Sequence, residues 1–210
     1  MLGPIRKPKT YEREKLVLDA WKKVVQTQEH FNDTCMQVRT LYATVVAAIL
    51  SLYGLVIKQA PPSIKIVGFD IDAIIPILLA ISLSSYLFYF VDRYWYHQLL
   101  LGAVAQGAQI EEEWGHKLPE ITMGAKITAR SPVDISKSRF LRLLAQAVVT
   151  DARLKTSGML HSDAKIEIFY KPLGYVALTL TLVIGLFGGI KYHEVSITQT
   201  LWSFIETLVF

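Results

Sequence analysis

The chain has 210 residues, which is enough for one domain, and its formal net charge is +4. Hydrophobic residues make up 52% and charged residues 19%, whereas a soluble domain carries roughly 25% charged residues. The single cysteine, Cys35, excludes an internal disulfide and a cysteine-based metal cluster. The small basic surplus is typical of the Lys and Arg that flank membrane spans, so we do not expect nucleic acid as a partner.

A charged helical segment opens the chain and covers residues 1–40. From Leu16 to Val25, apolar residues follow helical spacing with charges between them, which predicts an amphipathic helix over residues 10–39. The first apolar run begins only near Leu41, too far along the chain for a signal peptide, so we expect no cleavable leader.

Three charge-free runs predict membrane-spanning helices, since a bilayer core about 30 Å thick needs about 20 apolar residues. They cover residues 41–57, 73–91 and 173–190, and residues 41–91 form a two-span hairpin. Buried helices of a soluble bundle are the alternative, but three helices without a polar face would be unusual there.

The tail, residues 191–210, ends in an apolar stretch that permits two interpretations. Residues 197–210 fit an interfacial amphipathic helix, whose lipid-facing residues would be Leu201, Trp202, Ile205 and Leu208. A short fourth span is the other interpretation, although Glu206 would then be costly unless it faced protein or water. We therefore expect three membrane-spanning helices, or four if the tail inserts.

The orientation follows from the Lys and Arg residues beside the spans. Eight of these residues precede the first span and eleven lie between the second and third. The turn between the first two spans contains Lys58 and Lys65, and the tail contains Lys191. This asymmetry predicts that the N-terminus lies in the cytoplasm and the C-terminus outside.

The long region at residues 92–172 is predicted to be cytoplasmic and helical. The helix of the second span continues towards Glu111, Glu112 and Glu113, which we expect to be a solvated helix end. Residues 122–132 break the helical pattern and predict a loop, and residues 138–153 predict another amphipathic helix. The expected class is all-α, an integral membrane protein with a helical cytoplasmic region.

No catalytic or metal-binding motif is found. None of the five histidines has zinc-ligand spacing, and no phosphate-binding glycine loop or Gly-x-Ser-x-Gly elbow occurs. We therefore expect no catalytic residue, no metal and no cofactor.

Arg93 and His97 lie one helical turn apart in the segment Asp92-Arg93-Tyr94-Trp95-Tyr96-His97-Gln98. The aromatic residues favour an interfacial belt with Arg93 at the headgroup level. The alternative takes Arg93 and His97 as a polar pair that contacts phosphate or an RNA backbone. HEPN-type ribonucleases also use an Arg and a His, but separate them by four to six residues, and here three intervene.

Small residues recur at helical spacing on two of the spans. They are Ala43, Ala47 and Ser51 on the first and Gly185 and Gly189 on the third. Because no hydrophobic force acts between helices in lipid, small faces that let backbones approach are a main source of association. These residues pack the helices of one protomer or join several copies, and we favour joining.

The layout of residues 10–115 resembles a known family. A basic N-terminal helix precedes two close spans, and the helix at residues 92–113 ends in acidic residues. This resembles the RipA-like octameric bacterial inner-membrane proteins, and is similar to the pore-forming membrane accessory protein of type VI CRISPR systems. Two-span SLATT-type defence effectors look similar too. The resemblance implies a homo-oligomeric ring that perturbs membrane integrity under stress or phage attack, with Arg93 and His97 near its cytoplasmic mouth.

Three functional hypotheses follow. The first is a homo-oligomeric channel or pore-like effector in the bacterial inner membrane, with itself and the lipid bilayer as partners. The second is a non-conducting scaffold that presents its cytoplasmic helices to a soluble partner, such as a defence protein. The third and weakest is a membrane enzyme that uses Arg93 and His97 on phosphate.

Overall fold

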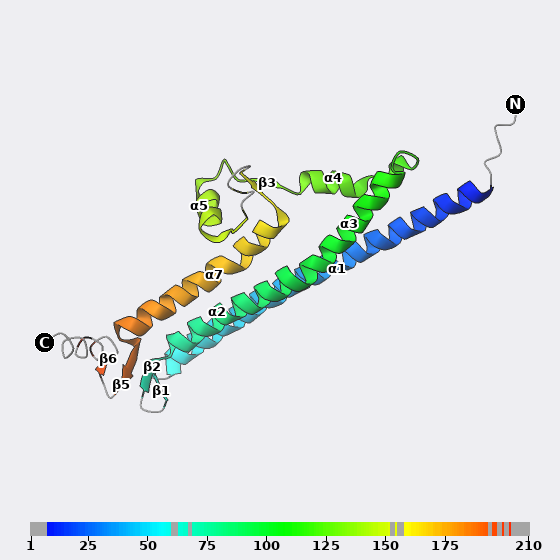
Figure 1. The fold of residues 1–210 in the computed structure, drawn as a ribbon. Coiled ribbons are helices and arrows are strands. Elements are labelled where there is room, and N and C mark those ends of the chain that lie inside the picture. The colour runs from blue at the N-terminus through cyan, green and yellow to red at the C-terminus, as the bar shows by residue number, and fades with distance from the viewer. Residues whose placement is uncertain are drawn as a thin grey trace. The chain divides into compact units, whose positions relative to one another are not determined.

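Three long helices dominate the computed structural model, which describes residues 8–59, 63–66, 69–151, 154, 158–192, 195–196, 199 and 202. They are α1 (Pro8–Gln59), α2 (Ile74–Phe90) and α7 (Ser162–Ile184) (Figure 1). Each belongs to a helical stretch that is long and apolar enough to cross a membrane. A helix satisfies every backbone polar group within itself, which lipid requires. The expected all-α class and three helices able to span a membrane are confirmed.

The chain divides into two compact units that are discontinuous in sequence. The polar unit comprises residues 1–38 and 90–166, and contains most of the charged side chains. The apolar unit comprises residues 39–89 and 167–210. Helices α1 and α7 each contribute residues to both units.

The core of the apolar unit forms around the buried ring of Tyr42 on α1. This ring packs against Phe88 of α2 and against Phe169 and Tyr170 of α7, at centroid distances of 5.6, 5.8 and 4.8 Å. Its hydroxyl lies 2.8 Å from Oγ of Ser85 on α2, and Ser85 donates to the carbonyl of Ile81. Tyr42 therefore joins all three helices of this unit.

A small antiparallel sheet, which the all-α prediction did not include, also belongs to the apolar unit. Its strands are β1 (Ser63–Ile66), β2 (Phe69–Asp72), β5 (Ile190–Tyr192) and β6 (Val195–Ser196), in the order β1-β2-β5-β6. Phe69 pairs with Tyr192 and Ile71 with Ile190. The link between the first two spanning helices therefore lies beside the segment that follows the third.

The polar unit combines its parts of α1 and α7 with the elements that lie between α2 and α7 in the chain. These are η1 (Val91–Tyr96), a π-helical turn, α3 (His97–Trp114), η2 (Pro119–Ile121), α4 (Met123–Arg130), β3 (Val133–Asp134), α5 (Arg139–Val148) and β4 (Met159–Leu160). Strands β3 and β4 pair antiparallel.

Two expectations about the polar unit need correction. The loop predicted at residues 122–132 is wrong, because α4 occupies most of that segment. The carboxylate of Glu111, from α3, caps the first turn of α4. Helix α5 is shorter than the predicted residues 138–153. Its N-cap is Ser138, whose Oγ accepts the backbone N–H of Leu141 at 3.3 Å, and it ends at Val148.

Both interpretations of the tail, including the role of Glu206, concern residues 197–210. Of these the structure describes Gln199 and Trp202, so the interfacial helix and the fourth span lie outside the described residues.

Candidate functional site

Arg93 and His97 meet at one carboxylate in the polar unit. Arg93 lies in the π-helical turn η1, and His97 begins α3. Asp163, in the first turn of α7, places Oδ1 at 2.9 Å from Nη1 of Arg93 and 2.9 Å from Nε2 of His97. The structure therefore supplies the partner of this pair, which neither composition nor motif had indicated.

This cluster is largely removed from solvent. The side chain of His97 is 5% exposed, that of Arg93 is 19% exposed, and the neighbouring Asp92 is fully buried. Burying charge is costly without a partner, which explains why one carboxylate serves both groups. Neither of the two pockets described below has Arg93 or His97 in its lining. The geometry therefore supports a role in holding η1 to the start of α7.

Two of the three aromatic residues between Arg93 and His97, Tyr94 and Trp95, are exposed, and Tyr96 is half-buried. The rings of Phe90 and Tyr94 lie 5.6 Å apart. Exposed Tyr and Trp rings suit a belt at a membrane–water interface, which is the structural interpretation of this segment.

Glu111 organises the other end of the polar unit. Its carboxylate accepts the backbone N–H groups of Gly124 and Ala125 at 2.8 and 2.9 Å, and the indole N–H of Trp21 at 3.2 Å. A carboxylate at a helix N-terminus satisfies free donors and complements the helix dipole. The expectation that residues 111–113 form a solvated end is wrong for Glu111, which is buried, whereas Glu112 and Glu113 are exposed.

A groove of about 520 Å³ opens beside Glu111, between α3 and α4. Val104, Gly107 and Ala108 from α3 and Ile127 from α4 give it a mostly apolar lining, to which Gln28 of α1 and Glu112 of α3 add polar groups. Such mostly apolar concavities with a few polar groups are typical binding surfaces.

A second set of predicted residues lies on the outer face of α1. Ala43, Ala47 and Ser51 are all exposed, as are Thr40 and Thr44 on the same side of the helix. Thr44 Oγ1 donates to the carbonyl of Thr40, and Ser51 Oγ to that of Ala47, so each hydroxyl is satisfied within α1. We call Thr40, Ala43, Thr44, Ala47 and Ser51 the small-residue face. It does not pack against α2 or α7, whose contacts with α1 involve the opposite side, around Tyr42.

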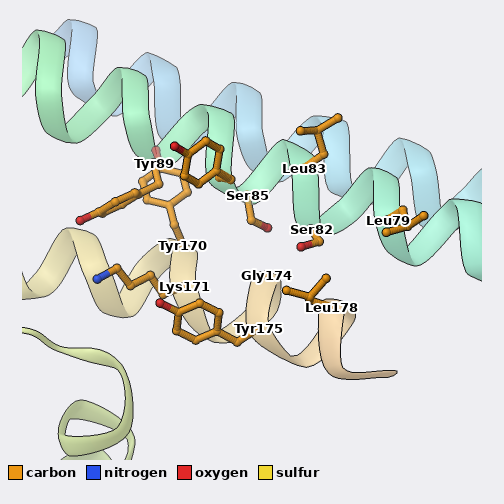
Figure 2. Close-up of a pocket in the computed structure, with 11 residues that line it drawn as sticks. Leu79, Ser82, Leu83, Ser85, Tyr89, Tyr170, Lys171, Gly174, Tyr175 and Leu178 are labelled. Carbon is orange, nitrogen blue, oxygen red and sulfur yellow. The ribbon is translucent and has the colours of Figure 1, made fainter. Parts of the chain in front are cut away.

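Figure 2 shows an open groove of about 410 Å³ between α2 and α7 in the apolar unit. Leucines line its apolar part, and Lys171 stands at one end with Tyr89 and Tyr170. Nζ of Lys171 lies 3.2 Å from Oε1 of Glu167 and 5.1 Å from the centre of the Tyr89 ring. The charge of Lys171 is therefore already paired within the protein.

The glycine that brings α7 against α2 is Gly174, which the sequence did not single out. A Cβ at this position would lie 2.9 Å from Cβ of Ser85. The predicted Gly185 and Gly189 instead bound a π-helical turn, η3 (Gly185–Gly189), and a Cβ at Gly185 would meet its nearest neighbour at an ordinary 3.6 Å. No sequence signal distinguished Gly174, because a close contact depends on the partner helix.

Over the described residues, no group of three His, Cys, Asp or Glu side chains is placed to hold a metal ion. No protein-family model, curated protein or solved structure matches this chain. Function is therefore inferred from the contacts and surfaces of the molecule itself.

Proposed function

We propose that this protein is a homo-oligomeric, pore-like effector of the bacterial inner membrane. In this proposal several copies associate in the bilayer and perturb its integrity, with the N-terminus in the cytoplasm. The observation that carries it is the small-residue face of α1, which is exposed along a helix able to cross a membrane.

The small-residue face suits association between helices in lipid. Association of helices in a bilayer gains from close van der Waals contact and hydrogen bonds between helices. Alanine, serine and threonine permit close backbone approach, and the hydroxyls of Thr44 and Ser51 retain acceptor capacity for a neighbour. Contact with lipid alone does not require small residues. The exposed residues that flank this face, such as Leu50 and Leu52, are larger and apolar.

The proposed topology is consistent with the sheet. Pairing of β2 with β5 requires that the link between the first two spans and the segment after the third lie on one side of the membrane. Three spans produce this arrangement, and the basic flanks of the chain favour the cytoplasmic side for the N-terminus.

The pore-like part of the proposal requires several copies, because three helices with a core filled by Tyr42, Tyr89 and Tyr170 leave no channel along their axis. A lumen would have to form between protomers. The resemblance of residues 10–115 to ring-forming membrane proteins is the reason for placing this activity in stress or phage defence.

The test combines particle mass with ion leakage. The wild-type chain in detergent should form a discrete multimer of the 23.7 kDa protomer, and its overexpression should depolarise the membrane. Ala47→Leu should shift the particle to smaller species and abolish leakage. Leu52→Phe is the control, since Leu52 is also exposed but lies about 140° around the helix from Ala47. A monomeric wild type would refute the proposal, and a multimer without leakage would refute its pore-like part.

A second candidate function, a non-conducting scaffold, is favoured by α5 outside the spans. Phe140 and Leu143 on this helix are 73% and 65% exposed, and exposed apolar side chains of this size mark contact surfaces. A scaffold predicts that a soluble partner co-purifies with the wild type and is lost from a Phe140→Ser variant, while multimer mass and membrane potential do not change.

A further inference from the structure

We propose that neighbouring copies also join through their polar units, by docking the outer face of α5 on one copy into the α3–α4 groove of the next. This inference rests on the proposed self-association and identifies the surfaces outside the membrane that would carry it. The partner is a second copy of the same chain.

The first surface is one side of α5. Ala145 and Val148 of this helix are buried, which fixes the opposite side as the outer face. That face carries Phe140 and Leu143, two strongly exposed apolar side chains, beside the exposed cations Arg139 and Arg142. Large apolar residues flanked by arginine are the composition that anchors protein interfaces.

The second surface is the α3–α4 groove. Gly107 and Ala108 have no long side chain to fill it, Val104 and Ile127 give it apolar lining, and Ile127 is itself exposed. The groove keeps its shape because Glu111 fixes the first turn of α4 to α3 through two backbone hydrogen bonds. The exposed carboxylate of Glu112 remains at its edge.

The two surfaces complement each other in both chemistry and sign of charge. The α5 face projects apolar groups next to positive charge, and the groove offers an apolar floor next to negative charge. Opposite charges at the edge of an interface orient the partners and exclude the reverse docking. An anionic membrane surface would also attract Arg139 and Arg142, but it would leave the groove and Glu112 without a role.

Because the two surfaces differ, the contact is heterologous, with each copy using its α5 face on one side and its groove on the other. Repetition of a heterologous contact closes into a ring when the rotation allows it. This is the symmetry that a pore-like assembly requires, and the small-residue face of α1 would pack within the same assembly.

Charge reversal tests the contact in the full-length chain. Two differently tagged copies are co-expressed, and the fraction of one that co-purifies with the other is measured in detergent together with particle mass. Arg142→Glu in both copies, or Glu112→Arg in both, should lower co-purification at least tenfold. Lys126→Glu, an exposed reversal on the side of α4 away from the groove, is the control and should leave it unchanged.

The decisive sample combines one copy carrying Arg142→Glu with another carrying Glu112→Arg. Each α5 face then meets an oppositely charged groove only on the other kind of copy. Co-purification should therefore recover, in multimers in which the two kinds of copy alternate. Failure to recover would overturn the docking. So would a result in which Arg142→Glu lowers co-purification and Glu112→Arg does not, which would point to another contact of Arg142, such as anionic lipid. If the wild type forms multimers that neither reversal affects, this inference fails and the proposed function stands. If the wild type does not self-associate, the proposed function itself fails.

Discussion

Oδ1 of Asp163 lies 2.9 Å from Nε2 of His97, although 66 residues separate them in the chain. The same oxygen pairs with Arg93, so a single acidic side chain at the start of α7 engages both members of the Arg-His pair. Within the polar unit, the contact joins η1 and the start of α3 to the first turn of α7. A pair that looked like a binding site in the sequence is held in place by a residue from another helix.

Replacing Asp163 should therefore destabilise the polar unit. Asp163→Ala removes the ion-pair partner of Arg93 and the hydrogen-bond partner of His97, and a buried polar group that loses its partner costs about 1–3 kcal/mol. We expect the low end of that range, because Asp163 is 25% exposed. The measurement is the thermal unfolding midpoint in detergent, with Glu120→Ala, an exposed acidic residue in η2, as the control. Equal midpoints for Asp163→Ala and the wild type would show that the cluster does not contribute to stability.

Removing the carboxylate of Glu111 should release α4. Glu111→Ala removes the acceptor of the Gly124 and Ala125 N–H groups, so the first turn of α4 loses its cap, at a cost of about 0.5–2 kcal/mol. Limited trypsin digestion reports this opening, since Lys126 lies within α4. Cleavage after Lys126 should become several times faster in Glu111→Ala. The control is Glu113→Ala, at an exposed residue two positions away, and trypsin should cleave it at the wild-type rate. Unchanged cleavage in Glu111→Ala would contradict the capping role.

The spanning helices could be predicted from the sequence because their signal is local. A run of residues such as 73–91 contains no charge, and lipid then leaves a helix as the available structure. The same reasoning identified Ala43, Ala47 and Ser51 by their spacing, but it could not say which side of α1 they occupy. That depends on Tyr42, whose contacts come from two other helices.

The features that were missed depend on contacts between distant segments. Helix α4 follows a proline and contains Gly124, so its local propensity is poor, and it forms where Glu111 meets its first turn. The strands β2 and β5 are short, and they pair only because separate spanning helices end close together. The sequence around a residue also does not show which distant segment it will contact. For this reason no local pattern distinguishes Asp163, Glu111 or Gly174.

Asp134 gives a prediction about pH. Its carboxylate accepts a hydrogen bond from the hydroxyl of Ser136 and another from the Ser136 backbone N–H, at 2.8 Å, and these lower the pKa of Asp134 below its usual value of 3.8. A lowered pKa in the folded state means that the ionised form stabilises the fold. This contribution is present above the usual pKa and is lost as the pH falls through the folded value.

Titration of the carboxyl carbon of Asp134 by NMR should show the lowered pKa directly. Ser136→Ala should move the pKa back towards the usual value, because the hydroxyl is the larger cause. Because Asp134 is fully exposed, its loss should change stability slightly, and Asp134→Asn should match the wild type most closely at low pH. A pKa at or above the usual value in the wild type would rule out this turn.

Gly174 gives the sharpest test of how α7 packs on α2. In a helix interior, Gly→Ala normally stabilises by about 0.5–1 kcal/mol, because glycine loses more conformational freedom on folding. At Gly174 the new Cβ would stand 2.9 Å from Cβ of Ser85, so α7 must move away from α2. That movement would weaken the hydrogen bond of Ser85 with Tyr42 and the packing of Tyr170. We therefore expect Gly174→Ala to lower the thermal midpoint in detergent, by an overpacking cost of about 1–3 kcal/mol.

Gly102→Ala on α3 is the matched control, since a Cβ there meets nothing within 4 Å, and it should raise the midpoint. The opposite signs are the prediction, and an increase for both variants would mean that α7 does not approach α2 through Gly174.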